Sequence, residues 1–293
     1  MKRAFQIILI LALAAGSASL AALGETYTVA SDTTWAPFEW ADAAGNLYGF
    51  DLDVMRCIAV LEGYEIDIVS YDWDIIFDDV GIGRVDIGAS GATIKPDRAL
   101  KVDFSEPYWG SDQAVLVRAI PDEEGTLVPE YNIIEALAGG HKVGAQIEVT
   151  GAFFIEALIA DGFDVELAEY PLYPLAVLDL INGNIDAVIQ DEQPSRVSAS
   201  VEDDIMIAGI IATGEVWGFF VGKGDPEGLL PKINSGVQKL KASGAWDNLV
   251  RAYMEPADPT ASIPAAWQAS AHLLEAGNVD GFAQSLADLA LGD

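Results

Sequence analysis

The sequence of 293 residues contains few cations, one Cys and two His. Lys and Arg number 15 against 46 Asp and Glu, which gives a formal net charge of −31. Nucleic-acid binding is not expected, because it depends on basic patches that neutralise phosphates. One Cys cannot form an intrachain disulfide, and one Cys with two distant His argues against a zinc site. Hydrophobic residues make up 51% of the chain, which excludes a largely disordered protein.

Residues 1–24 have the pattern of a secretory signal peptide. Lys2 and Arg3 precede an apolar run that reaches about Ala15, and small residues follow up to Gly24. The alternative is a membrane anchor, but the run is shorter than the ~20 residues that span a bilayer. We therefore predict a secreted protein that is cleaved near Gly24. No Cys begins the predicted mature chain, so a lipid anchor at its N-terminus is not expected.

Beyond the signal peptide, predicted strands alternate with predicted helices. Strands are predicted at 27–31, 66–70, 85–89, 114–118, 142–145, 164–167, 187–190 and 205–208, and helices at 51–62, 73–80, 133–138, 152–160 and 175–181. This alternation is typical of α/β proteins, in which helices cover both faces of a parallel sheet. The later sequence has no apolar run long enough to span a membrane.

A short internal repeat indicates two similar lobes. Gly83-Arg84-Val85-Asp86-Ile87 follows a predicted helix and opens a strand, and Gly183-Asn184-Ile185-Asp186-Ala187 does the same one hundred residues later. The alternative is that both are ordinary helix-to-strand connections. Ligands of α/β sheets bind beyond the carboxyl ends of strands. The residues that follow each repeat, Ser90–Thr93 and Gln190–Asp191, are therefore candidate site positions.

The charges near these positions suit a zwitterion. Arg98 follows the first repeat, and a guanidinium binds a carboxylate through two parallel hydrogen bonds. Asp191 follows the second repeat and would bind an ammonium group. Together they would hold the two charges of an α-amino acid across a cleft. The alternatives are a structural ion pair for Arg98 and a helix N-cap for Asp191.

Further motifs extend along most of the chain. They are Asp32–Trp40, Gly49–Asp53, Asp72–Asp74, Ser90–Arg98, Val102–Tyr108, Val143–Gln146, Ile185–Glu192, Gly222–Pro226 and Leu240–Asp247. In this order they resemble the periplasmic solute-binding proteins for polar amino acids, the family-3 receptors of ABC importers, from about Tyr27 to Met254. The resemblance implies an α/β, two-lobed periplasmic-binding-protein fold of type II, in which each lobe is a mainly parallel sheet flanked by helices and two crossings form the hinge.

The resemblance also divides the chain. We predict lobe 1 at 25–109 and 217–255, lobe 2 at 114–209, hinges at 110–113 and 210–216, and a C-terminal helical extension at 256–293. In the extension, Pro256, Pro259 and Pro264 predict a linker, and helices are expected at 265–276 and 279–291. The helices would pack on one lobe, or alternatively form a docking or oligomerisation element.

The resemblance implies a role for each ligand-binding residue. Arg98 would bind the α-carboxylate, assisted by Thr93 and by Thr150 at a helix N-terminus, which favours anions. Asp191 would bind the α-ammonium group together with the carbonyl oxygen of Gly91. The complete predicted set is Asp32, Trp35, Trp73, Ser90, Gly91, Thr93, Arg98, Thr150 and Asp191.

The ligand side chain would lie between Trp35 and Trp73, with Asp32 at its polar end. Two residues depart from the family pattern: Glu148 and Val149 stand where members commonly have Gly and then Ser or Thr. A Glu148 side chain that faced the cleft would disfavour an acidic ligand, although Glu more often faces solvent. Trp faces attract cations. We therefore expect a basic or neutral polar amino acid.

The predicted function is a soluble periplasmic receptor that delivers its amino acid to an ABC transporter permease. We expect a monomer with no catalytic residues, no metal and no cofactor. One alternative is an enzyme that resembles the cyclohexadienyl dehydratases, with Glu148 or Glu192 as the proton donor. Another is a sensory ligand-binding protein that acts on a separate signalling partner.

Overall fold

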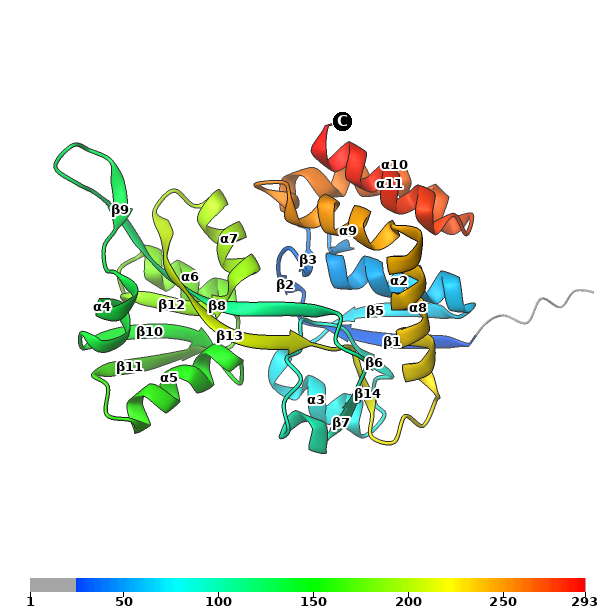
Figure 1. The fold of residues 1–293 in the computed structure, drawn as a ribbon, viewed down its shortest axis with the longest axis horizontal. Helices are drawn as coiled ribbons and strands as arrows, with labels where there is room; N and C mark the ends of the chain where they lie inside the picture. Colours follow the sequence, from blue (N-terminus) through cyan, green and yellow to red (C-terminus); the bar gives the residue numbers. More distant parts are fainter. Residues whose placement is uncertain (1–24, 293) are drawn as a thin grey trace, which may run out of the picture.

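The computed structural model describes residues 25–292, so the predicted signal peptide lies outside the described part of the chain. It consists of two α/β lobes that lie side by side (Figure 1). Two long strands, β8 (Trp109–Pro121) and β13 (Ile205–Trp217), run from one lobe into the other and pair with each other in antiparallel orientation. The predicted two-lobed α/β architecture is confirmed.

Lobe 1 contains a five-stranded sheet and a small three-stranded one. The larger sheet has the order β5 (Glu65–Ser70), β1 (Thr26–Ser31), β6 (Ile87–Gly88), β14 (Phe220–Gly222) and β7 (Val102–Phe104). The smaller consists of β2 (Thr34–Trp35), β3 (Glu39–Ala41) and β4 (Leu47–Tyr48). The helices are α2 (Phe50–Glu62), α3 (Trp73–Gly81), the 3-10 turn η1 (Arg98–Leu100), α8 (Leu229–Ser243) and α9 (Ala245–Met254).

Lobe 2 is built around one sheet of the order β11 (Val165–Tyr170), β10 (His141–Gln146), β12 (Ala187–Asp191), β8 and β13. Strand β9 (Leu127–Pro129) pairs with β8 and forms a projecting arm (Figure 1). The helices are α4 (Ile133–Ala138), α5 (Thr150–Ala160), α6 (Tyr173–Ile181) and α7 (Glu192–Val201).

Both large sheets are mainly parallel, as expected, and each contains one reversed strand, β14 in lobe 1 and β8 in lobe 2. Strands β5, β1 and β6 are parallel, as are β11, β10 and β12, because helices connect them in sequence. Strand β14 is antiparallel to both β6 and β7, and β8 is antiparallel to both β12 and β13, so β7 and β13 run in the same direction as the parallel strands of their sheets. The antiparallel strands belong to the crossings or directly follow them, and sequence periodicity does not reveal their direction.

The internal repeat has the same structural role in each lobe. The Asp86 carboxylate accepts a hydrogen bond from the Thr28 amide of β1 at 2.7 Å. The Asp186 carboxylate likewise accepts one from the Lys142 amide of β10 at 2.9 Å. Each Asp therefore ties the start of its strand, β6 or β12, to the neighbouring strand, β1 or β10.

The crossings are paired strands and not loops. The predicted hinges at 110–113 and 210–216 lie within β8 and β13, and the pairing shifts register between Ile211 and Glu215. The Asp112 carboxylate accepts hydrogen bonds from the amides of Thr213 and Gly214 in this irregular stretch, at 3.1 and 3.2 Å. The lobe boundaries and hinge motion stay predictions.

The C-terminal extension forms α10 (Pro259–Glu275) and α11 (Val279–Leu291), which lie against lobe 1 (Figure 1). The expected linker is wrong for Pro259 and Pro264, because both lie in α10; Pro259 occupies the first turn, where its missing N–H costs nothing. The Trp267 indole donates to the buried Asp53 carboxylate of α2 at 3.0 Å. None of the helices in residues 25–292 has the length and apolar character needed to cross a membrane.

Candidate functional site

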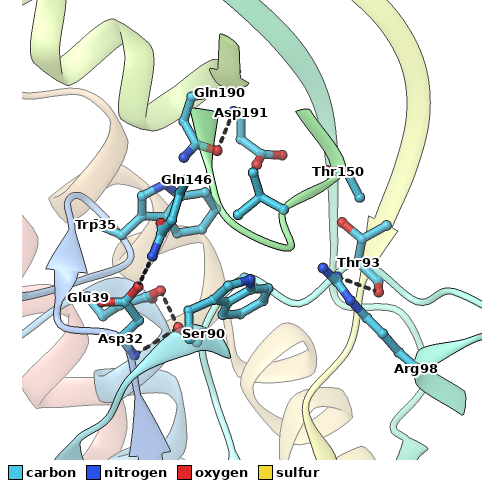
Figure 2. A pocket seen from close by; sticks show the side chains of 13 residues that line it. Asp32, Trp35, Glu39, Ser90, Thr93, Arg98, Gln146, Thr150, Gln190 and Asp191 are labelled. Carbon is cyan, nitrogen blue, oxygen red and sulfur yellow. Dashed lines mark hydrogen bonds between the residues drawn. The ribbon is translucent and has the colours of Figure 1, made fainter. Parts of the chain in front are cut away.

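A cavity of about 340 Å³, partly open to solvent, lies between the two lobes. All nine residues predicted from the sequence line the cavity, and Figure 2 labels most of them. Four other residues also line it: Glu39, Gln146, Val149 and Gln190. Their ligand contacts stay predictions, but the structure brings all nine together.

The cavity lies beyond the carboxyl ends of parallel strands, as expected for α/β sheets. Asp32 follows β1, and Ser90–Thr93 follow β6. On the other lobe, Asp191 ends β12, and Thr150 begins α5 shortly after β10. Val149, the N-cap residue of α5, makes no side-chain capping bond. The first amides of α5 therefore remain available to an anion.

Arg98 is a buried cation that forms no ion pair among residues 25–292. Its guanidinium donates to the backbone carbonyls of Thr93 at 3.1 Å and Glu148 at 2.9 Å, and it lies over the rings of Trp73 and Phe77. Burial lowers the pKa of Arg98 to about 10, against the opposing effect of nearby carboxylates. The structural ion pair considered as an alternative is not present, so the guanidinium charge is available to a ligand carboxylate.

Asp191 is a buried carboxyl group whose Oδ1 atom has no hydrogen-bond partner in the described part of the chain. It occupies the N-cap position of α7, but its side chain caps no amide. Burial, and then the negative charge of Glu215, raise the pKa of Asp191 to about 7. The capping alternative is therefore wrong, and the free oxygen suits an ammonium donor.

Two more carboxyl groups, Asp32 and Glu39, lie on the side of the cavity opposite Arg98 (Figure 2). Asp32 accepts a hydrogen bond at 2.7 Å from Gln146 of lobe 2, and burial raises its pKa. Glu39 accepts from the Ser90 hydroxyl at 2.8 Å, and its Oε2 atom has no partner among the described residues. Burial, and then repulsion by Asp51, raise the pKa of Glu39 well above its ordinary value. This side of the cavity would therefore attract a cation.

Trp35 and Trp73 provide the aromatic walls. Trp35 covers Gly91, where a Cβ atom would lie 2.1 Å from a ring carbon, and the Gly91 φ of 52° is also one that favours glycine. Gly91 therefore lets the indole approach the backbone. The Trp73 indole donates to the Glu148 carbonyl of the other lobe at 3.3 Å. Arg98 donates to the same oxygen, so these two hydrogen bonds connect lobe 1 to lobe 2.

The two departures from the family pattern have different positions. Val149 is buried and lines the cavity, whereas Glu148 is exposed and does not. Glu148 has a φ of 58°, a left-handed conformation that L-residues with side chains rarely adopt. The backbone at this position therefore suits Gly, and the Glu148 carbonyl is presented to lobe 1 at the cost of strain.

We expect Glu148→Gly to stabilise the protein by about 0.5–1 kcal/mol, because Gly adopts a positive φ without steric cost. The measurement is the free energy of unfolding in urea. Glu156→Gly is the matched control: Glu156 is exposed in right-handed α5, where Gly should destabilise by about 1 kcal/mol. Equal losses in both variants would contradict a strained Glu148.

Of the four lining residues without a predicted role, three lay within quoted motifs. Glu39 belongs to the motif that begins at Asp32, Gln146 ends the motif Val143–Gln146, and Gln190 was a candidate position after the second repeat. For Val149, the sequence indicates only a difference from the pattern of the family that the chain resembles, and no role. Residues 25–292 hold no group of three or more His, Cys, Asp and Glu side chains placed to bind a metal.

Comparison with known proteins identifies the class. Residues 27–256 match the model for bacterial extracellular solute-binding proteins, family 3. A probable histidine-binding protein of Neisseria gonorrhoeae is 32% identical, covering 78% of this chain and 83% of its own length. The lysine/arginine/ornithine-binding periplasmic protein of Escherichia coli (strain K12) is 26% identical, covering 87% and 97%.

Solved structures agree with this class. An ancestral arginine-binding protein bound to arginine superposes with a TM-score of 0.70 at 29% identity, over 79% of this chain and 99% of that one. The chain therefore belongs to the family-3 bacterial extracellular solute-binding proteins, and the predicted resemblance is confirmed.

Proposed function

We propose that this protein is a periplasmic receptor, released from its signal peptide, that binds a basic L-amino acid between its lobes and delivers it to an ABC transporter permease. The observation that carries the proposal is that two buried groups of opposite charge face one cavity and neither forms an ion pair within residues 25–292. Arg98 makes no ion pair within residues 25–292, and Asp191 has a carboxylate oxygen without a partner. The α-carboxylate and α-ammonium groups of an amino acid would satisfy both.

The remaining charges favour a cationic side chain. An amino acid with its carboxylate at Arg98 would direct its side chain towards Asp32 and Glu39 on the opposite side of the cavity (Figure 2). Burial raises the pKa of both carboxyl groups, so a cation between them would stabilise their ionised forms. The Trp35 face would add a cation–π contact. The names of the relatives, which specify histidine, lysine, arginine and ornithine, agree with this class.

Binding would favour the closed arrangement of the lobes. The direct contacts across the cleft include Gln146 to Asp32, and Arg98 and Trp73 to the Glu148 carbonyl. A ligand that touches Arg98 and Asp191 at once makes both sets of contacts only when the lobes are closed. The permease would distinguish loaded from empty receptor by this closure.

We propose binding without catalysis. The two carboxyl groups considered as proton donors do not line the cavity: Glu148 is exposed, and Glu192 forms an ion pair with Arg196 at 2.5 Å. Incubation with prephenate or arogenate is expected to yield no aromatic product. Formation of such a product would favour the dehydratase alternative.

The function is tested by a thermal-shift screen of the common amino acids. We expect L-arginine, L-lysine or L-histidine to raise the melting temperature most, since a ligand at 100 times its dissociation constant stabilises by about 2.7 kcal/mol. If no amino acid raises it, the receptor function is wrong.

The preference for a basic side chain is tested with Asp32→Asn. We expect this variant to bind L-arginine at least about tenfold more weakly, because a cation loses a buried carboxylate partner, and to bind L-glutamine less than about threefold more weakly. Asp67→Asn, an equal charge change at an exposed position of β5, is the control and should alter neither affinity. Equal losses for both ligands in Asp32→Asn would contradict the assignment.

A further inference from the structure

A chain of hydrogen bonds passes through the crossing strands and connects two site residues on opposite lobes. The Thr93 hydroxyl of lobe 1 donates to Oε2 of Glu215 on β13 at 2.7 Å. Gln113 on β8 donates from its side-chain amide to Oε1 of Glu215 and to the hydroxyl oxygen of Thr150 in lobe 2, both at 3.2 Å. Thr93 and Thr150 are the two residues expected to assist Arg98 in binding the ligand carboxylate.

The direction of each hydrogen bond in this series is fixed by the chemistry of the groups. A carboxylate has only acceptor atoms, so Glu215 takes the single hydroxyl proton of Thr93 and requires the NH₂ group of Gln113 to face it. The same NH₂ group donates to Thr150, which leaves the Thr150 hydroxyl proton free. The Gln113 carbonyl oxygen is buried without a partner among the described residues, which is the cost of this orientation.

The two hydroxyls therefore differ in what they can offer to a ligand. Thr93 has already donated its proton, so its hydroxyl cannot also donate to a carboxylate. Thr150 accepts from Gln113 and keeps its proton for the cavity, beside the first amides of α5. The Thr93 hydroxyl is therefore occupied by Glu215, whereas the Thr150 hydroxyl has a proton to offer to the cavity.

We propose that Glu215 is a positioning residue for ligand binding: through Gln113, it orients the Thr150 hydroxyl as a donor to the carboxylate held by Arg98. The proposal rests on the proposed function, since it concerns the same α-carboxylate. Because Glu215 and Gln113 lie on the paired crossing strands, the donor is aligned only where these strands hold the two side chains together. The crossings thus act on the site as well as joining the lobes.

The test is a double-mutant cycle measured by titrating L-arginine into the full chain. Glu215→Gln alone and Thr150→Val alone are each expected to weaken binding at least about tenfold. The double variant should be no more than about twofold weaker than Thr150→Val, because Glu215 acts through Thr150. Losses that multiply in the double variant would overturn the proposal and leave Glu215 with a general electrostatic role.

Two controls separate this result from other causes. Glu215→Gln combined with Asp32→Asn, at the far side of the cavity, should show multiplied losses. Gln113→Leu removes the donor but keeps the Glu215 charge. Its loss of L-arginine affinity should also largely disappear in the Thr150→Val background. If it does not, the proposed Glu215–Gln113–Thr150 relay is wrong. Absence of L-arginine binding by the wild type would refute both this relay and the basic-amino-acid assignment, whereas multiplied losses with a binding wild type refute the relay alone.

Discussion

Arg98→Ala is expected to weaken amino-acid binding by about 30- to 5,000-fold, in titration calorimetry with L-arginine. The guanidinium is buried and has no carboxylate partner within residues 25–292, so a ligand α-carboxylate would be its only opposite charge in direct contact. Removing one partner of a buried charge pair costs about 2–5 kcal/mol, because the other charge remains desolvated. In the Arg98→Ala complex, the ligand carboxylate would be the charge that stays desolvated and unpaired.

The fold of the Arg98→Ala variant should persist. Its guanidinium makes only two backbone hydrogen bonds and ring contacts, and the loss of an uncompensated buried cation offsets part of the lost packing. Arg84→Ala is the matched control in the same lobe: Arg84 is largely exposed and pairs with Asp79, and its loss should leave affinity unchanged. Retained binding in Arg98→Ala would refute the carboxylate role.

Asp191→Asn is expected to weaken L-arginine binding at least about 100-fold at pH 8 and to reduce its pH dependence. In the ligand-free protein the pKa of Asp191 is about 7, and only the ionised form attracts an ammonium group. For one such carboxyl group, wild-type affinity should be about 30-fold weaker at pH 5.5 than at pH 8. Titrations across this range measure both effects.

The same pKa has a consequence for stability. A carboxyl group whose pKa is raised in the folded state stabilises that state below its unfolded pKa, and this contribution is lost as the pH rises through about 7. The ligand-free protein should therefore lose stability between about pH 4 and pH 7, and the ligand-induced rise in melting temperature should be larger at pH 8 than at pH 5.5.

Asp203→Asn, at an exposed position of lobe 2, is the control for Asp191→Asn. It removes the same charge but should keep the wild-type affinity and pH profile. If Asp191→Asn behaves in the same way as this control, the ammonium assignment is wrong.

The sequence predicted the lobes because its strands and helices have clear boundaries. Helix α2 is an example: its apolar positions and Gly63, which adopts a left-handed conformation, mark the element and its end. The lengths of β8 and β13 were underestimated, since both continue through polar and Gly-containing stretches where only their mutual pairing keeps them extended. Pairing partners far apart in sequence cannot be read from local periodicity.

The charged and aromatic motif residues that the sequence singled out line one cavity, whereas the positions whose role depends on burial could not be predicted. Glu39 is fully buried beside Ser90, but most Glu side chains are exposed, so its type gives no warning. Gln113 and Glu215 gain their relation to Thr150 only through the register of the two crossing strands. The departure at Glu148 was visible in the sequence, whereas its left-handed backbone was not.

We propose that Arg98 and Asp191 hold the two α-charges of one basic amino acid between the lobes. The most direct measurement is a parallel titration of the full chain with L-arginine, agmatine and Nα-acetyl-L-arginine. Agmatine lacks the carboxylate, and the acetylated form lacks the ammonium charge. L-arginine is expected to bind at least about 1,000-fold more tightly than either analogue, because each analogue leaves one buried charge unpaired. Agmatine or Nα-acetyl-L-arginine binding as tightly as L-arginine would contradict it.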